Sequence, residues 1–208
     1  MGIAPKHRYL TPAMAGDGDK VILTKGAAIE TTAVLARAFP ETVRAKLGER
    51  LWKSASDYLH RCSTVDDALA AASVGLKGEG VTAMHDATEG GILGGLYELA
   101  LSCGRRIVAD TKDIHISEES ASICVLFGLD PLVTLSEGSL IITCQPDKAD
   151  AIRDALYRKK IASFVIGDVS DGEPGLWVRR GEATRSVTPP EHDPYWKAYS
   201  GAIRRKWR

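Results

Sequence analysis

Short apolar runs alternate with amphipathic segments along nearly the whole chain, and this alternation restricts the fold more than any other feature. The apolar runs have the length of β-strands, and the segments between them repeat apolar residues at helical spacing. Strands are expected at residues 20–24, 81–84, 106–109, 139–144, 163–166 and 176–179. Helices are expected at residues 28–39, 41–59, 64–76, 92–103, 118–127 and 148–159. The pattern predicts an α/β (α+β) fold in which helices pack on a mixed sheet.

No linker rich in proline, glycine or serine divides the chain, so we expect one main domain at residues 19–188. Residues 1–18 are expected to form an irregular N-terminal lead-in, and residues 189–208 a separate C-terminal tail that contains two tryptophans. Two interpretations fit the tail: a short helix packed on the body of the domain, and a mobile extension.

The charge balance excludes several classes of partner. The 208 residues include 27 Lys plus Arg and 27 Asp plus Glu, so the formal net charge is zero and no global field attracts nucleic acid or an anionic membrane. No apolar run approaches the roughly 20 residues of a membrane span, and no signal peptide is recognisable. The 4 cysteines are scattered, without the spacing of a zinc site or a disulfide framework. We therefore expect a cytoplasmic protein that binds neither nucleic acid nor membrane.

The stretch "MHDATEGGILGG" at residues 84–95 places a glycine-rich turn between an expected strand and an expected helix. Each glycine inside a helix costs roughly 1 kcal/mol relative to alanine, so the bare backbone needs a reason. A turn of this kind directs free backbone N–H groups and the positive end of the helix dipole at one point, where phosphate binds. Asp86 would repel that phosphate unless a divalent metal lay between them, which makes Asp86 a candidate Mg²⁺ ligand.

The same stretch can also be interpreted in two ways that need no ligand. Asp86 and Glu89 have the spacing of a capping box at a helix N-terminus. Gly90 and Gly91 are each followed by a second glycine four residues later, which suits close packing of another backbone. The turn matches neither the Walker A loop nor the G-x-G-x-x-G fingerprint, so its spacing alone leaves phosphate binding, capping and close packing open.

The segment "VTAMHDATEGGILGGLYELA" resembles the signature of the C-terminal domain of the AIR synthase (aminoimidazole ribonucleotide synthetase) superfamily. Three more segments are similar to the same domain in the same order, and together they cover about residues 16–180. These segments are "GDKVILTKGAAIETTAVLA", "ICVLFGLDPLVTLSEGSLIITC" and "VIGDVSDG". The resemblance is closest to hydrogenase-maturation-like and AIR synthase-related proteins. It implies the fold of that domain, with partly ferredoxin-like topology.

The resemblance also implies ATP and Mg²⁺ as cofactors. In the family, the residue at the position of Asp86 helps to hold Mg²⁺ at the ATP phosphates, and the turn that follows lies beside the nucleotide. Two further loops, at the end of the first strand and before the strand at 139–144, face the same cleft. The candidate nucleotide-binding residues are therefore Lys25, Gly26, Thr88, Glu89, Gly90, Gly91, Glu137 and Gly138.

Two departures from the family limit what the resemblance implies. Family members carry an N-terminal domain that supplies the dimer interface, most metal-binding aspartates and a glycine-rich ATP segment, whereas only about 18 residues precede the expected domain here. The chain also ends in Lys206-Trp207-Arg208, without the carbamoyl-carrying terminal cysteine of the hydrogenase maturation protein, so carbamoyl dehydration is not expected.

We expect one wall of an ATP- and Mg²⁺-dependent cleft that is inactive by itself. Its expected partners are a nucleotide or phosphorylated small molecule and an N-terminal domain or partner chain, through which a homodimer would also form. The alternative is a stand-alone, non-catalytic domain that binds a nucleotide, a phosphorylated metabolite or another protein.

Overall fold

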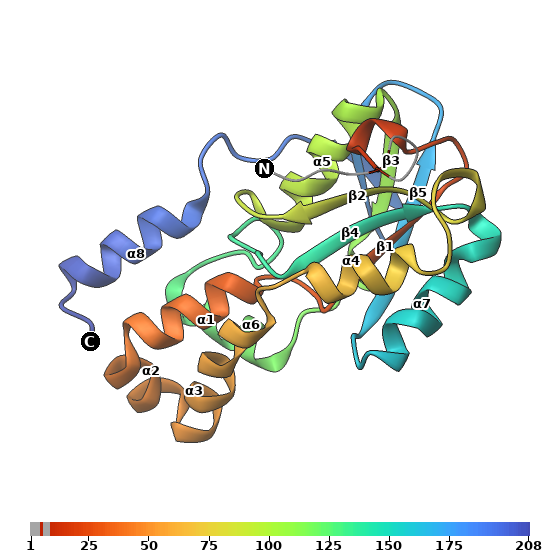
Figure 1. Ribbon diagram of the computed structural model, residues 1–208. Helices are drawn as coiled ribbons and strands as arrows, with labels where there is room; N and C mark the ends of the chain where they lie inside the picture. Colours follow the sequence, from red (N-terminus) through yellow and green to blue (C-terminus); the bar gives the residue numbers. More distant parts are fainter. Residues whose placement is uncertain (1–4, 6–8) are drawn as a thin grey trace.

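The chain forms a seven-stranded sheet that carries helices on both faces (Figure 1), as seen in a computed structural model that describes residue 5 and residues 9–208. The strand order is β2-β4-β1-β5-β3-β6-β7. β3 and β6 pair in parallel, and the other neighbouring strands pair in antiparallel fashion. The predicted α/β fold with a mixed sheet is therefore confirmed. The strands are β1 (Lys20–Thr24), β2 (Val81–Ala87), β3 (Arg106–Asp110), β4 (Ser139–Cys144), β5 (Ser163–Ser170), β6 (Gly175–Arg180) and β7 (Ala183–Val187).

The helices form three groups. α5 covers one face of the sheet, and α4 and α7 cover the other (Figure 1). α1, α2, α3, α6 and α8 share a separate hydrophobic cluster beside the sheet. No helix in the described part of the chain is long and apolar enough to cross a membrane. The helices are α1 (Ile29–Ala38), α2 (Pro40–Leu47), α3 (Glu49–Ser56), α4 (Val65–Ala72), α5 (Gly91–Cys103), α6 (Glu118–Phe127), α7 (Ala149–Arg158) and α8 (Pro194–Arg204).

The central strand β1 shows why its sequence is a continuous apolar run. Val21, Ile22 and Leu23 are all fully buried. Because side chains alternate between the faces of a strand, Val21 and Leu23 belong to the cluster under α5, whereas Ile22 belongs to the cluster under α4 and α7. A strand covered on both faces needs apolar residues at every position.

Several elements differ from the sequence prediction; for example, α4 ends at Ala72 and β5 continues to Ser170. The prediction of a single helix at 41–59 is wrong, because Gly48 adopts φ +87° and separates α2 from α3. β7 was not predicted, because this edge strand is exposed along most of its length and carries no apolar pattern. β2 continues to Ala87, so His85 and Asp86 lie in the strand rather than in the turn.

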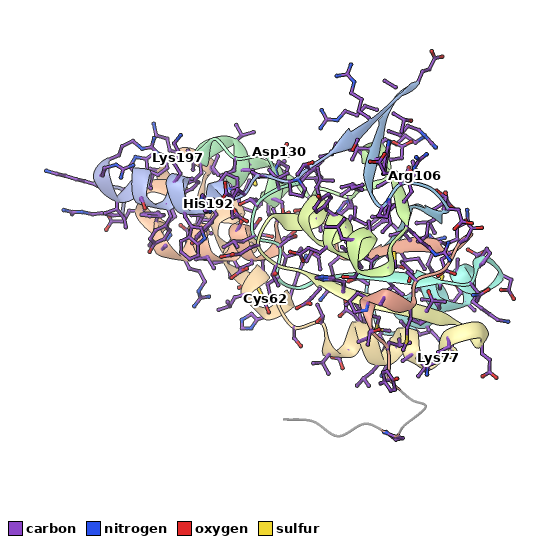
Figure 2. The ribbon with its side chains drawn as sticks, turned by 90° about the horizontal axis from the view of Figure 1, so that it is seen from above. Cys62, Lys77, Arg106, Asp130, His192 and Lys197 are labelled. Carbon is purple, nitrogen blue, oxygen red and sulfur yellow. The ribbon has the colours of Figure 1, made fainter. Side chains whose placement is uncertain are left out.

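The C-terminal tail packs on the body of the domain as a helix, which settles the alternative that the sequence left open. The ring of Tyr199 lies 5.3 Å from that of Phe39, and the ring of Trp207 lies 5.0 Å from that of Phe127, centroid to centroid. Lys197 on α8 and Arg106 on β3 lie at opposite ends of the molecule (Figure 2). Of the expected irregular lead-in, residues 1–4 and 6–8 lie outside the described residues, and the remainder contains a short 3-10 turn at Pro12–Met14.

The glycines at the start of α5 allow another backbone segment to approach closely. A Cβ atom on Gly91 would lie 2.7 Å from the carbonyl oxygen of Thr134 and 2.8 Å from that of Leu132. The same Leu132 carbonyl accepts a hydrogen bond from the backbone N–H of Leu93 at 3.0 Å. Close packing, which the spacing of the glycines had left open, is therefore confirmed.

The capping box is not formed. Asp86 lies in β2, and the N-cap position of α5 is Gly90, which adopts a left-handed conformation with φ +76°. No side chain of an N-cap residue therefore accepts a hydrogen bond from this helix end.

We predict that Gly91→Ala destabilises the protein more than Gly104→Ala at the other end of α5. Both glycines have positive φ, +63° and +65°, and a left-handed alanine costs roughly 1–2 kcal/mol at either position. Only Gly91 also faces backbone atoms at less than 3.0 Å, and such overpacking costs a further 1–3 kcal/mol or so. Urea denaturation of both variants measures the difference, and equal losses would show that the close approach does not matter.

Candidate functional site

Antiparallel pairing brings the predicted site residues to one edge of the sheet, namely the edge where β1 and β2 end and β4 and β5 begin. Ala87 at the end of β2 pairs with Ser139 at the start of β4, and Thr24 at the end of β1 pairs with Ser163 at the start of β5. The glycine turn, the loop after β1 and the 137–138 loop before β4 therefore emerge at the same edge. Two hydrogen bonds connect these loops: Ser136 N–H to the Thr88 carbonyl at 3.2 Å, and Ala28 N–H to Ser136 Oγ at 2.8 Å.

The N–H groups of the glycine turn are largely used by the protein itself. Gly91 N–H donates to the carbonyl of Thr88 at 3.2 Å. Gly90 N–H donates to Oδ2 of Asp193 at 2.8 Å, and Asp193 lies immediately before α8. The turn thus receives an anion, as the helix dipole favours, but that anion is a carboxylate of the same chain.

Asp193 was not recognised in the sequence, although its contacts explain why it is there. The side chain is 6% exposed, and its Oδ1 also accepts hydrogen bonds from the N–H of Tyr195 at 2.8 Å and from the hydroxyl of Thr134 at 3.4 Å. Burial raises the pKa of the Asp193 carboxyl, while these hydrogen bonds act in the opposite direction. The only local signal was an aspartate one residue before a proline at a helix start, which is typical of an N-cap.

Asp86 lies at the end of the edge strand β2 and faces solvent. Its side chain is 54% exposed, and Nδ1 of His85 lies 3.9 Å from its Oδ1. The other ring nitrogen of His85, Nε2, lies 3.1 Å from Oε2 of Glu98. His85 is thus positioned by its neighbours, and the Asp86 carboxylate remains accessible to a ligand.

Further carboxylates gather beside the glycine turn around Glu30, in the first turn of α1. Burial raises the pKa of the Glu30 carboxyl above 4.5, and the charges of Glu137, Asp193 and Glu89 raise it further, although a backbone hydrogen bond at Glu137 opposes them. Glu30 was also missed in the sequence, where an acidic residue in the first helical turn has an ordinary structural explanation. This edge of the sheet is therefore acidic.

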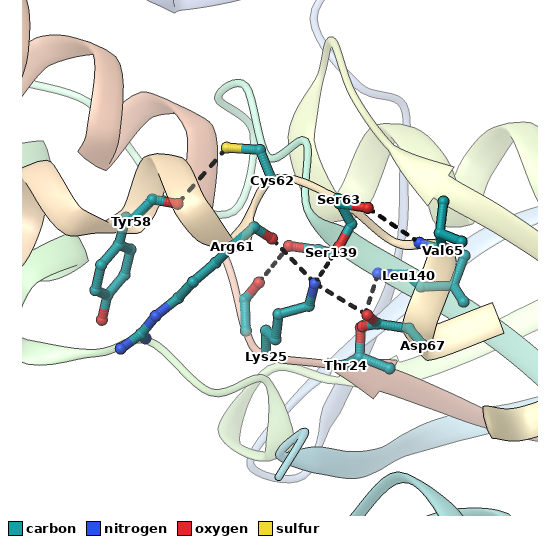
Figure 3. Close-up of polar contacts among 11 residues, drawn as sticks. Thr24, Lys25, Tyr58, Arg61, Cys62, Ser63, Val65, Asp67, Ser139 and Leu140 are labelled. Carbon is teal, nitrogen blue, oxygen red and sulfur yellow. Dashed lines mark hydrogen bonds and ion pairs between the residues drawn. The ribbon is translucent and has the colours of Figure 1, made fainter. Parts of the chain in front are cut away.

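Lys25 is held inside the protein and does not point to the glycine turn. Its Nζ lies 3.1 Å from Oδ2 of Asp67 and donates to the carbonyls of Arg61 at 3.0 Å and Ser63 at 2.8 Å (Figure 3). These acceptors match the three donors of an ammonium group. The neighbouring Gly26 packs against His115, whose carbonyl oxygen would lie 2.6 Å from a Cβ at that position.

Gly138 also has a packing role. With φ +104°, its Cβ would lie 2.6 Å from the carbonyl oxygen of Arg61 and 2.8 Å from the Cα of Cys62. The 137–138 loop is therefore held against the connection that leads into α4, and this contact places Glu137 near Glu30.

The described residues do not form a complete metal site. No group of three or more His, Cys, Asp or Glu side chains in this part of the chain is arranged to hold a metal ion. Mg²⁺ binding in nucleotide sites commonly uses one or two protein carboxylates together with phosphate oxygens and water. The exposed Asp86 carboxylate is a ligand of the type that such a site uses.

A glycine turn and a group of carboxylates at one edge of a mixed sheet define an α/β domain with a candidate ligand-binding edge. Residues 16–178 match the family described as AIR synthase related protein, C-terminal domain, and the chain belongs to this family. The family that the sequence resembled is therefore confirmed.

The chain is similar to curated hydrogenase maturation proteins. A putative hydrogenase expression/formation protein of Methanocaldococcus jannaschii is 29% identical over 116 residues, which cover 55% of this chain and 35% of the relative. Carbamoyl dehydratase HypE of Escherichia coli is 32% identical over 92 residues, which cover 43% of this chain and 27% of the relative. The matched region is thus about a third of these relatives or less.

Solved structures show the same fold. E. coli HypE, a hydrogenase maturation protein, superimposes with a TM-score of 0.74 at 21% identity and covers 93% of this chain and 56% of that chain. A HypE structure in complex with ATP has a TM-score of 0.67 at 17% identity, and the match covers 89% of this chain and 55% of that chain. A HypE–HypF complex has a TM-score of 0.64 at 20% identity, and the match covers 87% of this chain and 56% of that chain. This chain therefore corresponds to little more than half of each of these proteins.

We predict that Asp67→Ala destabilises the protein far more than Asp66→Ala. Both residues lie in the first turn of α4, but Asp67 is 2% exposed and pairs with the mostly buried Lys25, whereas Asp66 is exposed. Removing one partner of a buried pair costs about 3–5 kcal/mol, and an exposed carboxylate contributes about 1 kcal/mol or less. Urea denaturation checks both values. Similar small losses in the two variants would show that the Lys25 ammonium does not depend on Asp67.

We also predict a pH-dependent gain of stability in Glu30→Gln. Because the folded pKa of Glu30 is raised above 4.5, its contribution to stability is fully present below that pH and is lost as the pH rises through the folded pKa. The variant should therefore gain stability relative to the unmodified protein at higher pH. Unfolding by urea from about pH 4 to about pH 7 covers the titration range. Glu41→Gln, at an exposed position in the first turn of α2, is the matched control for the substitution itself. A gain that does not change with pH would contradict the prediction.

Proposed function

We propose that this chain supplies one wall of a site for ATP and Mg²⁺, and that a second domain or partner chain supplies the other. The observation that carries the proposal is the accessible Asp86 carboxylate at an edge where Glu30, Glu89 and Glu137 also lie close together. Carboxylates that repel one another favour a divalent cation, and a cation between them and a polyphosphate removes the repulsion on both sides.

The proposal gives each residue a limited role. Asp86 contributes one oxygen ligand to Mg²⁺, which would neutralise charge at the phosphates when it is bound. Thr88 and Glu89 line the nucleotide side, and Glu137 with Gly138 lines the adjoining side of the cleft. Lys25 is not assigned to phosphate in this proposal, because its ammonium group is already occupied by three acceptors. The amides of Gly90 and Gly91 support the shape of the turn rather than an open anion site.

The solved relatives support the nucleotide and the need for a further domain. A HypE protein was solved in complex with ATP, and another structure is a HypE–HypF complex, so that protein binds a nucleotide and a protein partner. The present chain covers 55% of the ATP-bound relative. The rest of the nucleotide contacts would come from the half of the protein that is not matched here, and this chain alone would not turn over ATP.

Paramagnetic broadening by Mn²⁺ tests the proposal even where binding is weak. With ATP present, Mn²⁺ in place of Mg²⁺ should selectively broaden the backbone amide NMR signals of residues 86–91 and 137–138. Asp86→Ala should remove most of this broadening, because the carboxylate is the ligand from this chain. Asp154→Ala, an exposed aspartate on α7, is the matched control and should leave it unchanged.

Two results would contradict the proposal. One is broadening that is spread over exposed carboxylates throughout the molecule, with no preference for these loops. The other is selective broadening that persists in Asp86→Ala.

A further inference from the structure

We propose that a cavity lined in part by Lys25 binds a small molecule that carries a phosphate group and a hydroxyl group. The cavity has a volume of about 510 Å³, which lies in the range of small-molecule sites, roughly 300–1,000 Å³. It forms where the end of β1, the connection into α4 and the turn between α7 and β5 meet. The residues that give the cavity its chemistry are Lys25, His60, Asp67, His115, Lys159 and Lys160.

The floor of the cavity is a fixed ion pair with one unused acceptor. Lys25 and Asp67 neutralise each other, and the ammonium group is also held by two backbone carbonyls (Figure 3). The second oxygen of Asp67, Oδ1, is buried and has no hydrogen-bond partner among the residues that the structure describes. A buried acceptor without a donor costs roughly 1–3 kcal/mol. Because this oxygen has almost no accessible surface, a ligand hydroxyl would reach it, and remove that cost, only after a small movement of the Asp67 side chain.

The wall opposite the connection into α4 carries two lysines that are available to an anion. Lys159 and Lys160 are exposed, and neither forms an ion pair within residues 9–208. Their backbone is nevertheless fixed, because Lys160 adopts φ +60° at the end of α7 and the next residue, Ile161, donates its N–H to the carbonyl of Leu156 at 3.0 Å. The position of both Cα atoms is thus set by the helix end and does not depend on a ligand.

His115 forms a further part of the wall and is also held in place. Its backbone carbonyl accepts a hydrogen bond from Ala27 N–H at 2.9 Å, and its ring stacks on Phe164 with the centroids 4.9 Å apart and the planes 12° apart. The ring nitrogens of His115 and of the neighbouring His60 add hydrogen-bonding groups to a cavity that is lined mostly by polar and charged residues.

The charge of the cavity selects an anion. Once Lys25 and Asp67 are counted as a neutral pair, the remaining charged residues of the lining are Arg61, Lys159 and Lys160 against the single carboxylate of Asp66. The guanidinium of Arg61 lies over the Tyr58 ring, 4.2 Å from its centroid, whereas the two lysines have no such contact in the described part of the chain. The whole chain has a formal net charge of zero, so this excess is local. Flexible lysines act as point charges and suit phosphate, whereas a planar carboxylate is best bound by the fork of an arginine.

This cavity is distinct from the acidic edge of the proposed nucleotide site. The glycine turn follows β2, the cavity adjoins β1 and β5, and β4 lies between β2 and β1. With strands about 4.8 Å apart, Asp86 and the glycine turn lie roughly 10 Å from the end of β1. The 137–138 loop lies closer, because Gly138 packs against Arg61, but neither Glu137 nor Gly138 lines the cavity. Binding here requires neither Mg²⁺ nor a second domain.

An NMR titration of the 208-residue chain without Mg²⁺ and ATP tests the inference. The probes are glycerol 3-phosphate, inorganic phosphate, acetate and glycerol. Glycerol 3-phosphate should bind more tightly than inorganic phosphate, because it also offers hydroxyl donors, and both should shift the amide signals of residues 159–162 and His115. Acetate and glycerol should bind more weakly than either phosphate.

Charge reversal at the wall identifies the site. Lys159→Glu combined with Lys160→Glu should weaken phosphate binding by about tenfold or more, which corresponds to about 1.4 kcal/mol. Lys197→Glu combined with Arg204→Glu makes the same change of charge on the exposed face of α8 and should have little effect. Asp86→Ala should leave this binding unchanged, so the outcome does not depend on the proposed nucleotide site.

Three results would overturn the inference. The first is the absence of saturable shifts with either phosphate. The second is an equal loss of affinity in the two charge-reversed variants, which would indicate general electrostatic attraction. The third is acetate binding as tight as phosphate binding, which would exclude phosphate as the selected group.

Discussion

The backbone of residues 130–136 packs directly against the start of α5, and the candidate site depends on this contact. Leu132 accepts a hydrogen bond from Leu93 N–H, and Ser136 donates its N–H to Thr88, so the segment binds both sides of the glycine turn. It also reaches α1, because Thr31 N–H donates to the Leu135 carbonyl at 3.2 Å. Backbone atoms approach this closely only where no Cβ intervenes, and this explains why the start of α5 is rich in glycine.

The same contact connects the sheet to the helical layer through one buried carboxylate. Asp193 accepts hydrogen bonds from Gly90 on the sheet side and from Tyr195 in α8, while Thr134 reaches it from the packed segment. A carboxylate is a strong acceptor for backbone N–H groups at helix starts, and here it serves two helices at once. No described cation lies within ion-pair distance of Asp193, so its negative charge adds to that of Glu30 and Glu89.

The sequence predicted the parts of the fold that burial dictates, such as the apolar run of β1, and the family resemblance correctly identified the domain. The edge strand β7 was missed because exposed strands need no apolar pattern. The candidate site was harder to predict from the sequence, because its decisive contacts join residues far apart in the chain. Gly90 and Asp193, for example, are separated by 103 positions. Lys25 follows a strand at the expected edge, but its partner Asp67 lies in a helix whose acidic first turn already had an ordinary explanation. Only the folded arrangement shows that this lysine is part of the interior.

Negative and positive side chains gather at two different places along this edge of the sheet, although the chain has a formal net charge of zero. Carboxylates gather beside β2 and β4, whereas Lys159 and Lys160 lie beside the start of β5. At physiological ionic strength the Debye length is about 8 Å, which is shorter than the distance of roughly 10 Å from β2 to β1. The exposed Asp86 carboxylate is therefore largely screened from these lysines, and each ligand responds mainly to the groups that it contacts. Under the two proposals, a metal-bound polyphosphate suits the acidic side and a free phosphate suits the basic side, so the same sheet edge would distinguish two forms of one chemical group.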